Sequence, residues 1–212
     1  MIVKFTRAQQ KSLLRQSSRR GRSWTAGPFH FSRPRLLLLI TTLQMSGQFV
    51  VLTFMAPLLT RLAGAGPDAI GLAFACYGVC GFIGIAIATR IVDSWGAFRT
   101  SVLSTALMLA GLTGWAICAG SYPLMLASVA LWGLGFAAVN SMQQVRLIGA
   151  APALASASVS LNSSVLYVGQ AVGSAIGGVL YARDLLLATG YVAAAFIALA
   201  LMTVFVTRPR QP

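Results

Sequence analysis

The chain has 212 residues, of which 57% are hydrophobic and 9% are charged. A soluble domain carries about 25% charged residues, so this composition excludes a soluble protein and indicates an integral membrane protein. The net charge of +13 does not indicate a nucleic-acid-binding protein, because nine of the sixteen basic residues precede Leu36 and the others lie between apolar runs or at the C-terminus. That distribution is typical of a membrane protein with a basic cytoplasmic tail.

Residues 1–34 are basic, rich in serine and free of acids. Three interpretations fit them. They resemble an organelle transit peptide, or a twin-arginine signal around Arg19 and Arg20, although the residues that follow are not apolar. We favour the third interpretation, a cytoplasmic segment beside the membrane that anionic lipid attracts.

Six apolar runs follow, each near the roughly 20 residues that a helix needs to cross a bilayer. We therefore expect an all-α membrane protein with six transmembrane helices, at residues 36–59, 70–89, 101–119, 123–144, 156–181 and 186–206. The predicted domains are a basic cytoplasmic tail at 1–34, a transmembrane domain at 35–207 and a cytoplasmic C-terminus at 208–212.

The basic residues predict the orientation of these helices. With both termini in the cytoplasm, fourteen of the sixteen basic residues face the cytoplasm, and only Arg61 and Arg183 face outward. This agrees with the positive-inside rule for a bacterial plasma membrane protein. The outward loops are short turns, so we expect no soluble catalytic domain.

The connection between the second and third runs carries Asp93, one of only three acids in the chain. Asp93 is expected to pair with an arginine or to cap a helix N-terminus, and Gly96 permits the positive φ of a tight turn. Such a turn can lock two helices together and release them, or it can be an ordinary polar loop. The residues of this predicted gating loop are Gly84, Arg90, Asp93, Gly96 and Arg99.

Uncharged polar side chains lie within several of the apolar runs. The candidates for lining a substrate cavity are Gln44, Gln48, Asn140, Gln144, Asn162, Tyr167 and Gln170. Amides can hydrogen-bond a polar solute in an aqueous cavity, or they can join two helices, and both interpretations stay open. Arg146 is interpreted as an anchor whose guanidinium reaches the membrane boundary.

A stripe of glycines in the fifth run predicts close helix packing. Gly169, Gly173 and Gly177 recur every four residues, and Gly178 lies beside them. Small residues at this spacing let a second helix approach closely.

No ionisable residue is placed near the middle of a run, where proton relays and ion sites usually need one. If protons drive transport, we expect the titrating group to lie outside this chain. Cys76 and Cys80 lie one turn apart with no histidine nearby, so we expect packing rather than metal binding. No cofactor or metal is expected.

Three motifs in this order resemble the C-terminal six-helix half of a major facilitator superfamily transporter, in the sugar and drug efflux branch that includes arabinose-efflux-like permeases. They are the loop from Gly84 to Arg99, the segment Gln143-Gln144-Val145-Arg146-Leu147 with Ala151-Pro152 after it, and Ser160-Leu161-Asn162-Ser163-Ser164 before the glycine stripe. The loop departs from the family pattern, because a single Arg99 replaces the basic pair that often follows the glycine.

This resemblance implies twelve helices in two halves, with the substrate between the halves near the midplane. The chain has one such half. The second half would come from another copy or from a separate chain, and coupling acids would lie there. The resemblance also implies that Asp93, Gly96 and Arg99 form a gate contact at the cytoplasmic face.

The leading hypothesis is a half-size or truncated transporter that exports a small sugar-like or drug-like solute through the bilayer by alternating access, with protons as a candidate coupling ion. The alternatives are an inactive fragment and a structural or regulatory membrane partner that assembles through the glycine stripe. We do not expect an enzyme, because the single histidine is His30 in the tail and no paired acids or Gly-x-Ser-x-Gly elbow occur.

Overall fold

The computed structural model describes residues 32–150 and 155–208. Contacts divide the chain into a unit of Met1–Arg33 and a unit of Pro34–Pro212, and the second unit is described below. The helices are α2 (Ser32–Leu52), α3 (Met55–Ala63), α4 (Pro67–Ile117), α5 (Tyr122–Ala150), α6 (Ala155–Ala182) and α7 (Leu186–Val206). The described ranges contain no strand, and the predicted all-α membrane fold is confirmed.

Two of the predicted domains fall mostly outside the described residues. Only the last three residues of the predicted tail at 1–34 are described, and they begin α2. Of the predicted C-terminal segment at 208–212, only Arg208 is described.

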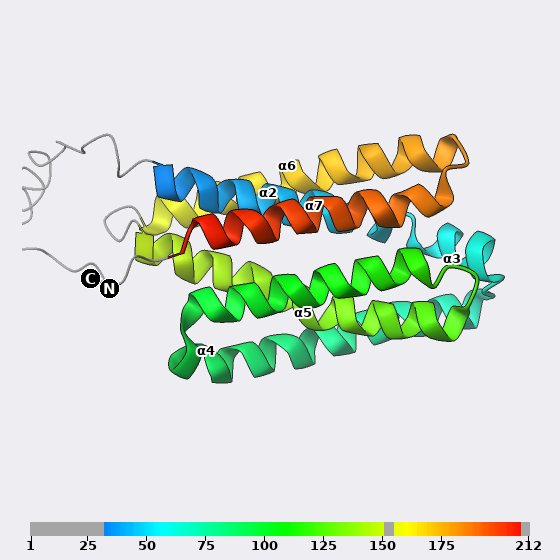
Figure 1. The fold of residues 1–212 in the computed structure, drawn as a ribbon, viewed down its shortest axis with the longest axis horizontal. Coiled ribbons are helices and arrows are strands. Elements are labelled where there is room, and N and C mark those ends of the chain that lie inside the picture. The colour runs from blue at the N-terminus through cyan, green and yellow to red at the C-terminus, as the bar shows by residue number, and fades with distance from the viewer. Residues whose placement is uncertain (1–31, 151–154, 209–212) are drawn as a thin grey trace, which may run out of the picture. The chain divides into compact units, whose positions relative to one another are not determined.

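The longest helix, α4, reverses its direction at Gly96. Five helices are long and apolar enough to cross a membrane, and α4 is counted as one of them although it has 51 residues. Gly96 has φ 78° and ψ 155° inside this helix, a backbone region that only glycine adopts readily. The chain folds back there (Figure 1), so the two arms at 67–95 and 97–117 correspond to the second and third predicted spans. The prediction of a loop at residues 90–100 is wrong, because all of these residues except Gly96 are helical.

The first predicted span, at 36–59, is broken into two helices. α2 ends at Leu52 and α3 begins at Met55, with a turn between them. The span was expected to end near Pro57, but Pro57 does not end a helix. It lies in the first turn of α3, where its missing N–H leaves no helical hydrogen bond unmade. α3 ends at Gly64, which has φ 64° and donates its N–H to the preceding turn.

The fourth span extends beyond its predicted end at residue 144. α5 continues to Ala150, so Arg146 lies inside a helix rather than in a loop. The rest of the connection expected at 145–155 falls on residues 151–154, which lie outside the described ranges.

α5 packs against both arms of α4. A Cβ on Gly84 would collide with the backbone of Leu134, and a Cβ on Gly111 would collide with the backbone of Trp132. These close approaches exclude any larger residue at either glycine. Gly84 was predicted to be part of the gating loop, and in the structure it is a contact between α4 and α5.

α2 is enclosed by the helices around it. Its residues from Gln44 to Gln48 are all buried, and a Cβ on Gly47 would lie 2.9 Å from the carbonyl oxygen of Ala193 on α7. The main apolar core lies beside α2 and includes the fully buried side chains Met108, Leu112, Trp115, Met125 and Trp132. A second cluster, at the end of the unit that carries Gly96, comprises Leu37, Ile40, Leu147 and Val204.

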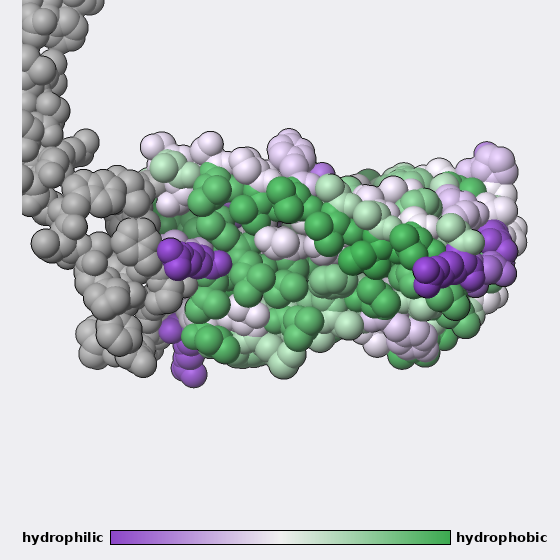
Figure 2. All heavy atoms as spheres, turned by 90° about the horizontal axis from the view of Figure 1, so that it is seen from above, coloured by the Kyte–Doolittle hydropathy of each residue, from purple (hydrophilic) through white to green (hydrophobic). Residues whose placement is uncertain are grey.

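Large apolar side chains also cover the outside of the unit. Phe82, Ile117 and Val206 are exposed by 74%, 68% and 75%. Figure 2 shows a hydrophobic band between hydrophilic groups at the two ends of the visible face. This surface suits contact with lipid acyl chains.

Candidate functional site

The two amides predicted on α2 are fully buried and join α2 to α4. Gln44 Nε2 donates a 2.9 Å hydrogen bond to Thr105 Oγ1 on the second arm of α4. Gln48 Oε1 accepts a 3.2 Å hydrogen bond from the hydroxyl of Tyr77 on the first arm. Both glutamines therefore make interhelical contacts within the unit, and the sequence did not identify either partner.

Asn162 on α6 makes an equivalent contact with α2. Its Oδ1 accepts a 2.8 Å hydrogen bond from Thr41 Oγ1, and its side chain is fully buried. Ser46 Oγ donates to the carbonyl oxygen of Gly169 at 3.1 Å. These polar contacts hold α6 on α2 in a region that excludes solvent.

The glycine stripe of α6 lies against the same helix. Cβ atoms on Gly173 and Gly177 would collide with the backbones of Ser46 and Val50, and one on Gly169 would lie 2.8 Å from the Thr42 carbonyl oxygen. α2 therefore occupies the stripe. The hypothesis that another protein assembles on this stripe is wrong for this structure.

Gly178 lies at the edge of this contact. A Cβ added there would lie 3.4 Å from the ring of Phe54, which is ordinary packing. Gly178 therefore belongs to the contact near the turn between α2 and α3, but it is not required to be glycine in the way that Gly173 is.

Several buried amide atoms have no hydrogen-bond partner among the described residues. These are the acceptors Gln44 Oε1 and Asn140 Oδ1 and the donors Gln143 Nε2 and Asn162 Nδ2. Leaving such an atom unpaired costs about 1–3 kcal/mol. Asn140 and Gln144 are partly buried rather than enclosed, and both lie on α5, one helical turn apart.

Polar side chains are also exposed on α6. Tyr167 is exposed by 68% and Gln170 is half-buried. The same helix exposes the serines Ser156, Ser160, Ser163 and Ser164. Ser174 Oγ lies 2.7 Å from Thr53 Oγ1, in the break between α2 and α3. A membrane-spanning helix whose polar side chains face outward indicates a surface that meets water or protein rather than lipid.

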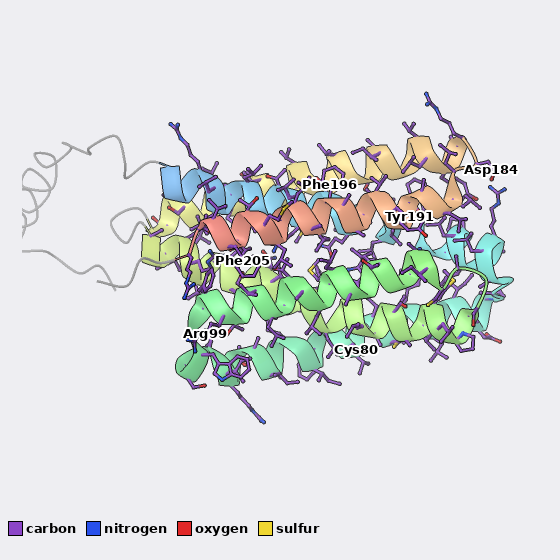
Figure 3. All side chains as sticks on the ribbon, viewed as in Figure 1. Cys80, Arg99, Asp184, Tyr191, Phe196 and Phe205 are labelled. Carbon is purple, nitrogen blue, oxygen red and sulfur yellow. The ribbon has the colours of Figure 1, made fainter. Side chains whose placement is uncertain are left out.

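The charged residues of the predicted gating loop are exposed and form no ion pair among the described residues. Arg90, Asp93 and Arg99 are all exposed, and among the described residues the salt bridge is instead Arg61–Asp184, at 2.6 Å. The expected ion pair within the loop is therefore not formed. Figure 3 shows Arg99 and Asp184 at opposite ends of the unit, named here the Gly96 end and the Asp184 end.

Arg146 makes more contacts than an anchor needs. Its guanidinium donates to Ser101 Oγ at 3.2 Å, to Gln143 Oε1 at 3.2 Å and to Thr207 Oγ1 at 2.6 Å. It also lies 5.6 Å from the centre of the Phe98 ring. Arg146 thus joins α4, α5 and the end of α7. Thr207 could not be recognised as a partner from the sequence, because it lies 61 residues away from Arg146.

The described ranges contain no group of histidine, cysteine, aspartate or glutamate that could hold a metal ion. Cys76 and Cys80 are free and partly buried. The candidate residues therefore offer amides, hydroxyls and one guanidinium as their polar groups.

Comparison with known proteins identifies the family. The family model described as Major Facilitator Superfamily matches residues 37–212. The chain belongs to this superfamily. Together with the apolar helices, this makes it an integral, multi-pass membrane protein.

Two bacterial transport proteins are similar to this chain. It is 25% identical over 177 residues to an uncharacterized MFS-type transporter, YbcL, of Bacillus subtilis, covering 82% of this chain and 45% of that protein. It is 29% identical over 147 residues to the purine ribonucleoside efflux pump NepI of Escherichia coli K12, covering 67% of this chain and 35% of the pump.

A third relative is named as a regulatory protein rather than as a transporter. The transcription regulatory protein OpdE of Pseudomonas aeruginosa is 26% identical over 184 residues, which cover 85% of this chain and 45% of that protein. The chain thus spans less than half the length of these curated relatives.

Proposed function

We propose that this chain is one six-helix half of an efflux transporter of the bacterial plasma membrane. It would act with a second half, supplied by another copy, by a separate chain or by the rest of a longer polypeptide. The span of less than half of each relative supports the half-size proposal, as does the efflux activity in the name of the Escherichia coli relative.

The observation that carries this proposal is the outward polar face of α6. Tyr167 and Gln170 would be costly against acyl chains, whereas they suit a wet cavity between two halves. The neighbouring Ser163 and Ser164 donate to carbonyl oxygens of their own helix. Facing halves with substrate at their boundary are the arrangement expected of this superfamily. Tyr167 and Gln170 are the proposed solute contacts of this half.

The buried amides have a different role in this proposal. Gln44, Gln48 and Asn162 hydrogen-bond helices to each other, so they would hold α2, α4 and α6 together as one body. A body that moves as a unit can rock against its partner, which alternating access requires. Asn140 and Gln144, which are only partly buried, would join the cavity when the halves move.

The proposed orientation places the Gly96 end and both termini in the cytoplasm. Arg90, Asp93 and Arg99 would then be exposed at the cytoplasmic face, where the second half could supply charged partners for the gating loop. The three acids of the chain, Asp68, Asp93 and Asp184, lie at the ends of helices, so a proton-coupling acid would belong to the second half.

The proposed substrate is a small polar solute, sugar-like or drug-like. Hydroxyls and amides are the groups that this half offers, and they match ring hydroxyls and heteroatoms rather than a strongly charged ligand. The name of the Escherichia coli relative supports a purine ribonucleoside as the first probe.

Uptake into inside-out vesicles from native cells tests this function. Vesicles from wild-type cells should accumulate a labelled solute from a panel of nucleosides and sugars, and vesicles lacking the chain should not. Tyr167→Ala should lower uptake about tenfold, equivalent to about 1.4 kcal/mol of lost binding. Leu199→Ala, on the apolar outside of α7, is the matched control and should leave uptake unchanged. Equal uptake with and without the chain, across the panel, would contradict the proposal.

A structural or regulatory membrane partner is the second candidate function. The name of the Pseudomonas aeruginosa relative favours it. In that case deletion of the chain would change gene expression or the stability of a partner protein while solute uptake stayed the same.

A further inference from the structure

The Gly96 end of the unit carries several arginines, and in the described ranges its one acid, Asp93, forms no ion pair with them. Arg146 is held by Ser101, Gln143 and Thr207, which are all neutral. A guanidinium has five N–H donors, and these bonds use three of them. Two donors of Arg146 therefore have no partner among the described residues.

The acids of the chain lie elsewhere or are unpaired. Asp184 pairs with Arg61 at the opposite end of the unit, and Asp68 lies in the first turn of α4. Asp93 is exposed and makes no ion pair within the described ranges. A partly buried guanidinium without a counter-charge is unfavourable in an apolar environment, so an anion from outside the chain would stabilise it.

Two more arginines adjoin, along the chain, residues that contact Arg146. The Phe98 and Phe205 rings are 6.5 Å apart, and Arg146 lies over the Phe98 ring. Arg99 directly follows Phe98, Arg208 directly follows the Thr207 that Arg146 binds, and both arginines are exposed. Figure 3 shows Arg99 and Phe205 at the same end of the unit.

Exposed apolar side chains adjoin these arginines. Phe205 is exposed by 53% and Val206 by 75% on the last turn of α7. A phosphate beside the arginines would thus have an apolar surface next to it along α7. This juxtaposition suits a molecule with an anionic head and an acyl chain better than free phosphate.

We propose that Arg99, Arg146 and Arg208 form a binding site for the phosphate of an anionic phospholipid, with Phe205 and Val206 in contact with its acyl chain. Arginine binds phosphate through paired N–H donors, and the two unused donors of Arg146 are available for this. The bound lipid would also join α4, α5 and α7 at this end. The site does not involve the proposed solute contacts Tyr167 and Gln170.

Thermal unfolding of the purified full chain in detergent tests the site. Added phosphatidylglycerol, at about ten times its Kd, should raise Tm by about 4 °C. Phosphatidylcholine, which has no net charge, and inorganic phosphate at the same concentration should not. An equal rise with inorganic phosphate would overturn the lipid proposal, and an equal rise with phosphatidylcholine would overturn the requirement for an anionic lipid.

The variants separate lipid binding from folding. The double variant Arg99→Gln with Arg208→Gln changes only exposed side chains, so it should fold and lose most of the Tm rise. Arg146→Gln should lose it completely, but this variant also removes interhelical bonds. Arg183→Gln, an exposed arginine at the Asp184 end, is the matched control and should keep the full rise. A full rise in the double variant would overturn the proposal.

Discussion

The hydroxyl of Tyr77 on α4 donates a 3.2 Å hydrogen bond to the side-chain carbonyl oxygen of Gln48 on α2, and both residues are buried. The Tyr77 ring packs against Trp132, with the ring centres 4.9 Å apart. Tyr77 thus joins α4 to α2 through a polar contact and to α5 through an aromatic contact. Interhelical hydrogen bonds of this kind contribute about 0.6 kcal/mol on average in membrane proteins.

Tyr77→Phe should therefore lower the free energy of unfolding by about 1 kcal/mol, because it keeps the ring contacts and leaves Gln48 Oε1 unpaired. A double-mutant cycle with Gln48→Met, measured by unfolding in mixed micelles, should give a coupling energy of about 0.6 kcal/mol. A coupling energy of zero would show that the bond does not form.

The contact between α6 and α2 depends on Gly173. Gly173→Ala should destabilise the protein by about 2 kcal/mol, because the added Cβ forces the two backbones apart. Gly71→Ala, on the first arm of α4, is the control, since nothing lies within 4 Å of a Cβ there. That substitution should leave stability unchanged or raise it by about 0.5–1 kcal/mol. Equal effects of the two substitutions would contradict the packing of α6 on α2.

The reversal of α4 depends on the backbone of Gly96 alone. A Cβ at Gly96 would have no atom within 4 Å, so Gly96→Ala adds strain without a collision. We expect a loss of about 1–3 kcal/mol in the free energy of unfolding. Gly149→Ala, at an equally open helical position of α5, should cost nothing. A harmless Gly96→Ala would mean that the turn does not need a positive φ.

At the opposite end, the ion pair Arg61–Asp184 should matter less than the backbone of Asp184. The two side chains are exposed by 43% and 70%, so solvent screening limits the pair to about 0–1 kcal/mol. Asp184 has φ 61°, which Asn tolerates and a β-branched residue does not. Asp184→Asn should therefore change stability by less than about 0.5 kcal/mol, and Asp184→Val should cost more than about 1 kcal/mol. Equal losses of stability in the two variants would show that the ion pair, not the backbone of Asp184, is the cause.

The apolar runs predicted the membrane-spanning helices well, because the length of each run and the turn-forming residues between the runs determine where these helices lie. The turn at Gly96 was placed correctly for the same reason. The break between α2 and α3 was missed, since Thr53 and Phe54 carry no turn signal and the nearby Pro57 lies inside α3 rather than at the break. Helix ends were placed too early at charged residues, which can stay helical after the apolar run has ended.

The roles of the polar residues were harder to predict. Residues on every face of α2 are buried, so periodicity could not separate a cavity-facing amide from a packed one. Gln44 and Tyr167 were placed in one candidate set, yet the structure buries the first completely and exposes the second by 68%. The partners Thr41, Thr105 and Thr207 are unremarkable in sequence and are recognisable only through long-range contacts.

Photo-crosslinking from position 167 tests the central proposal most directly. A benzophenone amino acid in place of Tyr167, irradiated in native membranes, should form an adduct whose peptides, identified by mass spectrometry, belong to a second six-helix half. The same amino acid in place of Leu199, which is exposed by 48% on α7, should react with lipid. Lipid adducts alone from position 167 would contradict the account, because the polar face of α6 would then have no partner.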